Sequence, residues 1–279
     1  MEPSEAYLLS KLLFGSTRLL RTIKLGGVLR TLRSRAWWTF LAPFHEDLIF
    51  RMRTFGVALT ECRNHPNSAS YRAQEVCTES RRLMGRLLDM RDTELHCCWM
   101  LFAAGEDASL EYVETCARSR PTDARLSLLG MADRHPVSKN TVSCALLGRD
   151  DRHTRWKPLR CFATNDLVAH EKLFETTRTD WAQFYRSVLV FPLTYPDSND
   201  PGIYETLGFL AFDSLRKDAF PGVPDVFAYR DRWTEYHALL AKSTAFQLGA
   251  IIADILAMFL RPAYMNRATT GGVNGQLSR

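Results

Sequence analysis

The sequence predicts an α+β domain in which helices cover both faces of an antiparallel sheet of five or six strands. The clearest strands are the apolar runs at residues 187–193 and 207–213, because a turn containing proline and glycine at 196–202 connects them. Both runs are apolar at successive positions. Side chains alternate between the two faces of a strand, so these runs indicate a sheet that is covered on both sides.

Helical patterns on either side of this hairpin supply the cover. Apolar residues recur there every three or four positions. The expected helices span residues 5–35 (interrupted at Gly26 and Gly27), 44–62, a stretch from Ser68 or Ser70 to Met90, and 226–260. We therefore divide the chain into a helical N-terminal extension at 1–68, a folded domain at 69–262 and a flexible tail at 263–279.

Shorter elements fill the middle of the chain. The apolar run at 95–104 predicts a buried strand that ends at Gly105, and residues 159–164 predict a weaker strand. The other elements expected here are a short helix at 111–119, a strand at 125–131, a short helix at 136–148, and a helix or loop at 165–179. These strands and the hairpin make up the predicted sheet.

Two segments of the hairpin resemble the strand motifs of a known protein family. Residues 185–193 (YRSVLVFPL) match a strand of the form S-x-hydrophobic-x-x-P-L. Residues 207–213 (LGFLAFD), followed by Ala219 and Phe220, match a strand and turn of the form I-G-V-L-x-L-D…x-F. Both resemble the GAF family, a small-molecule sensor fold related to PAS. The resemblance covers 71–260, is best over 185–220, and implies that the domain at 69–262 is a GAF-like sensor domain.

The resemblance also implies where a ligand would lie, between the sheet and the segments that cover one face. Here those segments are 137–147 and 160–166, with the strand at 95–102 as part of the floor. A few convergent polar groups in an apolar cleft suffice to recognise a small molecule. The candidate ligand-binding residues are Asn140, Ser143, Asn165, Asp166, Ser187 and Trp99. The alternative is structural: Asn165 and Asp166 would form a turn or helix cap, and Ser187 would be a satisfied strand hydroxyl.

Motifs for catalysis are absent from the sequence. We find no Gly-rich phosphate loop, G-x-S-x-G elbow or H-E-x-x-H. The thiol and imidazole groupings are Cys62 with His65, and His96 with Cys97 and Cys98. A zinc site needs about four ligands, and neighbours on a strand point to opposite faces. We therefore expect no catalytic or metal-binding residues, and the sequence names no cofactor.

Two cysteine-dependent activities of GAF proteins are the alternatives. One group reduces free methionine sulfoxide, but its cysteine motif cannot be placed in this chain. Another attaches a bilin through a cysteine in the pocket helices. Cys144 or Cys161 would occupy such a place here, although no neighbouring motif accompanies either residue. The expectation remains a protein that is not an enzyme.

The charge and cysteine content favour a cytoplasmic protein. Net charge is +5, but 31 acidic residues are spread among the basic ones, so no nucleic-acid-binding face stands out. The seven cysteines are odd in number and several lie in apolar runs, as expected of reduced thiols. The first residues lack the pattern of a signal peptide, and no run reaches the ~18 apolar residues of a membrane span.

The function we expect is that of a non-enzymatic sensor. A small molecule would bind the pocket, and the change would pass to a partner protein in trans through the terminal helices. The apolar stripes at 5–35 and 226–260 favour a homodimer. The alternative is a ligand-free scaffold for dimerisation and protein–protein interaction. The basic N-terminal helix, followed by Trp37 and Trp38, also suits contact with a membrane surface.

Overall fold

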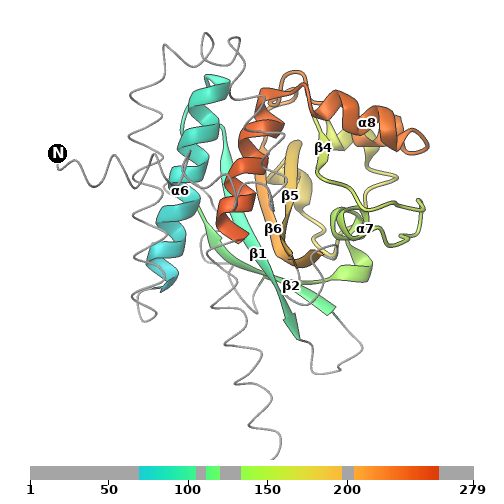
Figure 1. Ribbon diagram of the computed structural model, residues 1–279, viewed down its shortest axis with the longest axis horizontal. Helices are drawn as coiled ribbons and strands as arrows, with labels where there is room; N and C mark the ends of the chain where they lie inside the picture. Colours follow the sequence, from blue (N-terminus) through green and yellow to red (C-terminus); the bar gives the residue numbers. More distant parts are fainter. Residues whose placement is uncertain (1–68, 105–110, 120–132, 197–203, 258–279) are drawn as a thin grey trace, which may run out of the picture. The chain divides into compact units, whose positions relative to one another are not determined.

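The computed structural model of the chain describes residues 69–104, 111–119, 133–196 and 204–257, all within the compact unit Arg51–Arg279. The sheet there has six strands in the order β3-β2-β1-β6-β5-β4, and every neighbouring pair is antiparallel (Figure 1). Helices lie against both faces, which confirms the predicted α+β class. The expected extension at 1–68, strand at 125–131 and tail at 263–279 lie outside the described residues.

The strands combine two long central pairs with short edges. β5 and β6 are paired from Ser187 opposite Ser214 to Pro196 opposite Tyr204, which confirms the predicted hairpin. The strand bounds are β1 His96–Ala104, β2 Glu111–Arg118, β3 Arg134–Pro136, β4 Phe162–Thr164, β5 Ser187–Pro196 and β6 Tyr204–Ser214.

Gly208 lets β6 approach β1 closely. A β-carbon at this position would lie 2.0 Å from the carbonyl oxygen of Met100, and the backbone φ is +156°. The pairing register of β5 and β6 also shifts beside it, between Leu193 and Thr194. A side chain at 208 is therefore incompatible with the sheet as built.

Two helices cover one face of the sheet. α6 (Ala69–Leu88) packs on β1 and β2, and a second helix at Thr244–Ala257 packs on β5 (Figure 1). The second helix comes close because Gly249 has no side chain: a β-carbon there would lie 2.3 Å from the Phe191 ring. Leu189, Phe191 and Phe212 are buried beneath this layer.

The opposite face is covered by α7 (Thr141–Leu147), by loops and by four 3-10 helices. Asn140 caps α7 by accepting a hydrogen bond from the Ser143 amide at 3.1 Å, and Gly148 ends it in the left-handed conformation. The 3-10 helices are η4 Val137–Lys139, η5 Leu167–His170, η6 Trp181–Gln183 and η7 Val226–Tyr229. This layer encloses the candidate site described below.

Two predicted elements are wrong. Residues 111–119 form strand β2 rather than a helix, because Val113, Thr115 and Ala117 are buried at a period of two. The long helix expected at 226–260 is instead broken into η7, α8 (Trp233–Leu240) and the helix Thr244–Ala257, with an 89° bend between the last two. Ser243 starts the new helix, since its hydroxyl accepts from the Phe246 amide at 3.4 Å.

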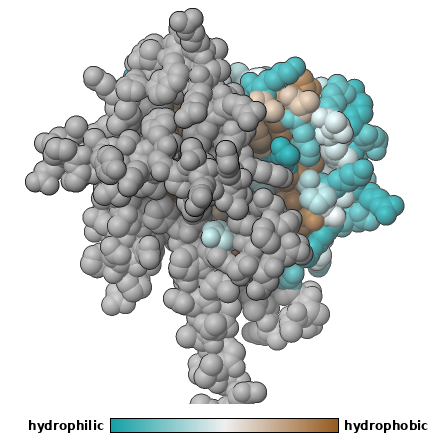
Figure 2. Space-filling model, viewed as in Figure 1, coloured by the Kyte–Doolittle hydropathy of each residue, from teal (hydrophilic) through white to brown (hydrophobic). Residues whose placement is uncertain are grey.

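The described surface carries little exposed apolar area. Figure 2 shows mainly hydrophilic residues over α8 and the loops around α7. The large apolar side chains that are exposed in the described ranges are Val168 and Leu215. Among the described helices, none is both long and apolar enough to cross a membrane by itself, and only the bent pair of α8 with Thr244–Ala257 meets the length and composition test.

Candidate functional site

A cavity of about 100 Å³ lies on the face of the sheet opposite α6. Its floor consists of side chains that alternate along the three central strands, and its wall is formed by α7 and the loop before η6. The floor residues are Cys98 and Met100 on β1, Val188 and Val190 on β5, and Phe209 and Ala211 on β6. The cavity therefore has an apolar base between the sheet and its covering layer.

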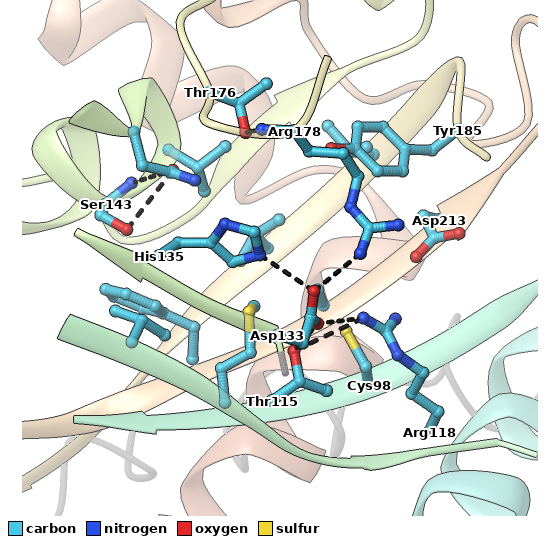
Figure 3. A pocket seen from close by; sticks show the side chains of 18 of the residues that line it. Cys98, Thr115, Arg118, Asp133, His135, Ser143, Thr176, Arg178, Tyr185 and Asp213 are labelled. Carbon is cyan, nitrogen blue, oxygen red and sulfur yellow. Dashed lines mark hydrogen bonds and ion pairs between the residues drawn. The ribbon is translucent and has the colours of Figure 1, made fainter. Parts of the chain in front are cut away.

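Asp133 organises the polar end of the cavity (Figure 3). The residue is 2% exposed and directly precedes β3. Its Oδ2 accepts from the Thr115 hydroxyl and pairs with Arg118 Nη2. Its Oδ1 lies 2.7 Å from Arg178 Nη2 and 3.1 Å from His135 Nε2. Both carboxylate oxygens are thus engaged twice.

A β-bulge in β2 makes this arrangement possible. Thr115 and Arg118 are three positions apart and would face opposite sides of a regular strand. In β2, however, Thr115 pairs with Met100 and Ala117 with Trp99, so Cys116 is an extra residue in the strand. The bulge turns both the hydroxyl and the guanidinium toward Asp133.

The surroundings of Asp133 keep it ionised. Burial opposes the charged form, but the hydrogen bond from His135, the charge of Arg118 and the hydrogen bond from Thr115 outweigh it. Together they hold the pKa of Asp133 well below its ordinary value. A permanent negative charge therefore lies between two guanidinium groups on one wall of the cavity.

Arg178 enters the site from the loop between η5 and η6, and this loop is anchored to α7. The Thr141 amide donates to the Glu175 carbonyl at 2.9 Å, and the Glu175 amide donates back to the Thr141 hydroxyl at 2.8 Å. The Phe184 ring lies 5.1 Å from the Arg178 guanidinium carbon. The position of Arg178 is therefore coupled to the start of α7.

Two of the six predicted site residues line the cavity. Asn140 and Ser143 lie at its α7 wall, where the Asn140 carbonyl oxygen also caps the helix. Their contact with a ligand stays a prediction.

The other predicted residues lie elsewhere. Asn165 exchanges hydrogen bonds with the Phe220 backbone at 2.9 Å each. The Ser187 hydroxyl lies within hydrogen-bonding distance of the carbonyl oxygens of Asn165 and Arg216. Asp166 pairs with Arg186 at 2.8 Å. Trp99 points to the α6 face, since its neighbours Cys98 and Met100 line the cavity. In the structure Ser187 is the satisfied strand hydroxyl that was the alternative, and Asn165 holds the backbone of a distant turn.

The charged cluster was not among the residues predicted from the sequence. Asp133 and His135 are two positions apart, so they share one side of a strand, and this spacing was the available signal. Arg178 lies in a stretch that shows no periodic pattern, and only the tertiary structure brings it to Asp133.

Three of the buried thiols, those of Cys97, Cys144 and Cys161, are poorly suited to nucleophilic chemistry. Burial raises the pKa of Cys97 and Cys161 well above the ordinary value, and it also raises the pKa of Cys144. A raised pKa disfavours the reactive thiolate. Within the described ranges, no three or more His, Cys, Asp or Glu side chains are grouped so that they could hold a metal ion.

Comparison with solved structures finds GAF domains. A phycoerythrobilin-bound GAF domain from a cyanobacterial phytochrome has a TM-score of 0.42 and 13% identity, over 78% of this chain and 97% of that one. A far-red cyanobacteriochrome photoreceptor has a TM-score of 0.39 and 12% identity, over 79% and 95%. A type II free methionine-R-sulfoxide reductase from Thermoplasma acidophilum has a TM-score of 0.37 and 13% identity, over 69% and 95%.

The fold of this chain is a six-stranded antiparallel sheet between a two-helix layer and a layer of one helix and loops, which is the architecture that the resemblance to the GAF family implied. No protein-family model matches the sequence, and no curated protein is similar to it. At such low identities and TM-scores, the structural likenesses carry no argument about the ligand or activity of this chain.

Proposed function

We propose that this chain is a non-enzymatic sensory domain that binds a small molecule in the cavity between Asp133, α7 and the central strands. The observation that supports this is the combination of an apolar floor with a buried charge cluster around Asp133 at one end. Binding pockets typically combine an apolar lining with a few fixed polar groups. Such a cluster is costly to bury, and a role in recognition gives a reason for it.

The proposed response is a shift between arrangements of the loop that carries Arg178. A ligand that contacts Arg178 favours one arrangement of this loop, and the Thr141–Glu175 hydrogen bonds couple the loop to α7. We propose that the change then passes in trans to a partner protein through the terminal helices of a cytoplasmic homodimer. Light scattering of the full chain over a range of concentrations tests the dimer, and a monomer at every concentration would exclude it.

The binding function is tested by thermal melting against nucleotides, cyclic nucleotides and metabolites. A ligand that binds only the folded state raises the melting temperature by mass action. Ala211→Ile fills the cavity from its floor, and Ala228→Ile adds the same atoms to an exposed position on η7. We expect a ligand that stabilises the parent and the Ala228→Ile variant but not the Ala211→Ile variant.

A ligand-free scaffold is the second candidate, and the small volume of the cavity favours it. The cavity measures about 100 Å³, whereas pockets for drug-sized ligands measure roughly 300–1,000 Å³. The scaffold predicts no melting shift with any compound, and it predicts that Ala211→Ile leaves partner binding unchanged.

A further inference from the structure

One buried polar atom of the cavity has no partner. Arg178 Nη1 is shielded from solvent and makes no hydrogen bond among the described residues. The Arg178 side chain is 11% exposed, and Figure 3 shows it reaching down to Asp133. Leaving a buried donor without a hydrogen bond is energetically unfavourable, so a bound acceptor at this N–H group would stabilise the site.

The part of the chain that the structure describes does not supply that acceptor. Asp133 already receives Thr115 and Arg118 on one oxygen and His135 and Arg178 Nη2 on the other. The second acid in the lining, Asp213, makes no hydrogen bond to Nη1. The Phe184 ring faces the guanidinium but offers only its π surface.

The rest of the cavity is suited to a ligand whose other end is short and apolar. Val190, Phe209 and Ala211 lie on its floor, with Val142 and Phe174 on its wall. A volume of about 100 Å³ holds roughly seven water-sized groups, at about 15 Å³ each. A nucleotide or a bilin is much larger than this space.

We infer that the ligand is a small carboxylate with a short aliphatic body. Its carboxylate oxygen accepts from Arg178 Nη1, and its chain lies over Val190 and Phe209. This inference rests on the proposed function, because it names the ligand class of the same cavity. A carboxylate is favoured over a neutral carbonyl because a hydrogen bond from the Arg178 guanidinium to an ionised acceptor is charge-assisted, and it is therefore stronger than one to a neutral acceptor.

The test uses three unbranched probes with five carbon atoms each: pentanoate, pentanamide and pentylamine. Titration calorimetry on the full chain is expected to give pentanoate binding at least about tenfold tighter than pentanamide, and no pentylamine binding. Arg178→Gln removes the guanidinium, and we expect pentanoate to bind this variant no better than pentanamide. Arg178→Lys keeps the positive charge but loses the planar guanidinium with its several N–H donors. We expect this variant to bind pentanoate more tightly than pentanamide, but by a smaller factor than the parent. It serves as the second test if Arg178→Gln does not fold.

Arg186→Gln is the matched control. Arg186 donates hydrogen bonds to both carboxylate oxygens of Asp166, but this pair lies outside the cavity. This variant is expected to bind pentanoate as the parent does. Failure of pentanoate to bind the parent, or equal binding of pentanoate by parent and Arg178→Gln, would overturn the inference. Binding of pentanamide or pentylamine at least as tight as that of pentanoate, if Ala211→Ile blocks it, would overturn the ligand class and leave the proposed function standing. No response to any compound in the melting panel would overturn both.

Discussion

Replacing Asp133 with asparagine changes one buried charge and almost no volume. An asparagine has one acceptor oxygen and one NH₂ donor in place of two acceptor oxygens. Whichever way the amide turns, its NH₂ group faces a guanidinium donor, that of Arg118 on one side or that of Arg178 on the other. The variant therefore loses the counter-charge of two largely buried guanidinium groups and at least one of its hydrogen bonds.

The expected loss of stability for Asp133→Asn is about 3 kcal/mol, the order found when one partner of a buried ion pair is removed. Urea unfolding followed by tryptophan fluorescence measures it. Asp166→Asn is the control, since Asp166 pairs with the more exposed Arg186 and Lys217. We expect its cost to stay below about 1 kcal/mol.

The pH dependence gives this prediction a second reading. The pKa of Asp133 is lowered in the folded state, so its stabilisation is complete above the unfolded-state pKa of about 4 and is lost as the pH falls. The difference between parent and Asp133→Asn should accordingly shrink on acidification below about pH 4. A loss of stability no larger than that of Asp166→Asn would refute the reasoning that a buried charge network stabilises this end of the cavity.

Three further predictions concern residues outside the cavity. Gly208→Ala is expected to lower the free energy of unfolding by on the order of 3 kcal/mol or to prevent folding, because its β-carbon would collide with the Met100 carbonyl oxygen. Urea unfolding measures this, and a cost below about 1 kcal/mol would contradict the close approach of β6 to β1. Burial raises the pKa of Asp254 to about 6, which makes its charged form unfavourable in the folded state. The contribution of Asp254 to stability is therefore present below about pH 4 and lost as the pH rises through about 6. Asp254→Asn should stabilise the fold by on the order of 2 kcal/mol at neutral pH and by little at pH 4. Equal effects at both pH values would contradict this. Asn165→Ala removes two hydrogen bonds to the Phe220 backbone and should cost about 2 kcal/mol in urea unfolding without changing pentanoate affinity; a changed affinity with unchanged stability would return Asn165 to the ligand site.

The fold could be predicted where the signal is local. Two apolar runs and the turn between them predict the β5–β6 hairpin, and apolar residues at helical spacing predict α6. Strand β2 was missed because one of its buried positions, Thr115, is polar and because the bulge at Cys116 breaks the alternation of its side chains. The 226–260 helix was overextended because the break at Ser243 depends on one capping hydroxyl within an apolar pattern.

The candidate site could be predicted only in part, for a physical reason. Asn140 and Ser143 follow from the place of α7 beside the sheet, which the resemblance implies. The Asp133 cluster depends instead on a bulge at Cys116 and on a loop that carries Arg178 back to the strand edge. Neither a bulge nor a long-range ion pair leaves a periodic trace in the sequence.

The proposed small-molecule binding is tested most directly by a crystal structure of the chain purified from cells without denaturation. Our account predicts electron density for a small ligand in the cavity, with an oxygen within hydrogen-bonding distance of Arg178 Nη1 and an apolar part over Phe209. A cavity filled by the chain's own side chains, with Arg178 Nη1 bonded to an acceptor from the protein, would contradict it.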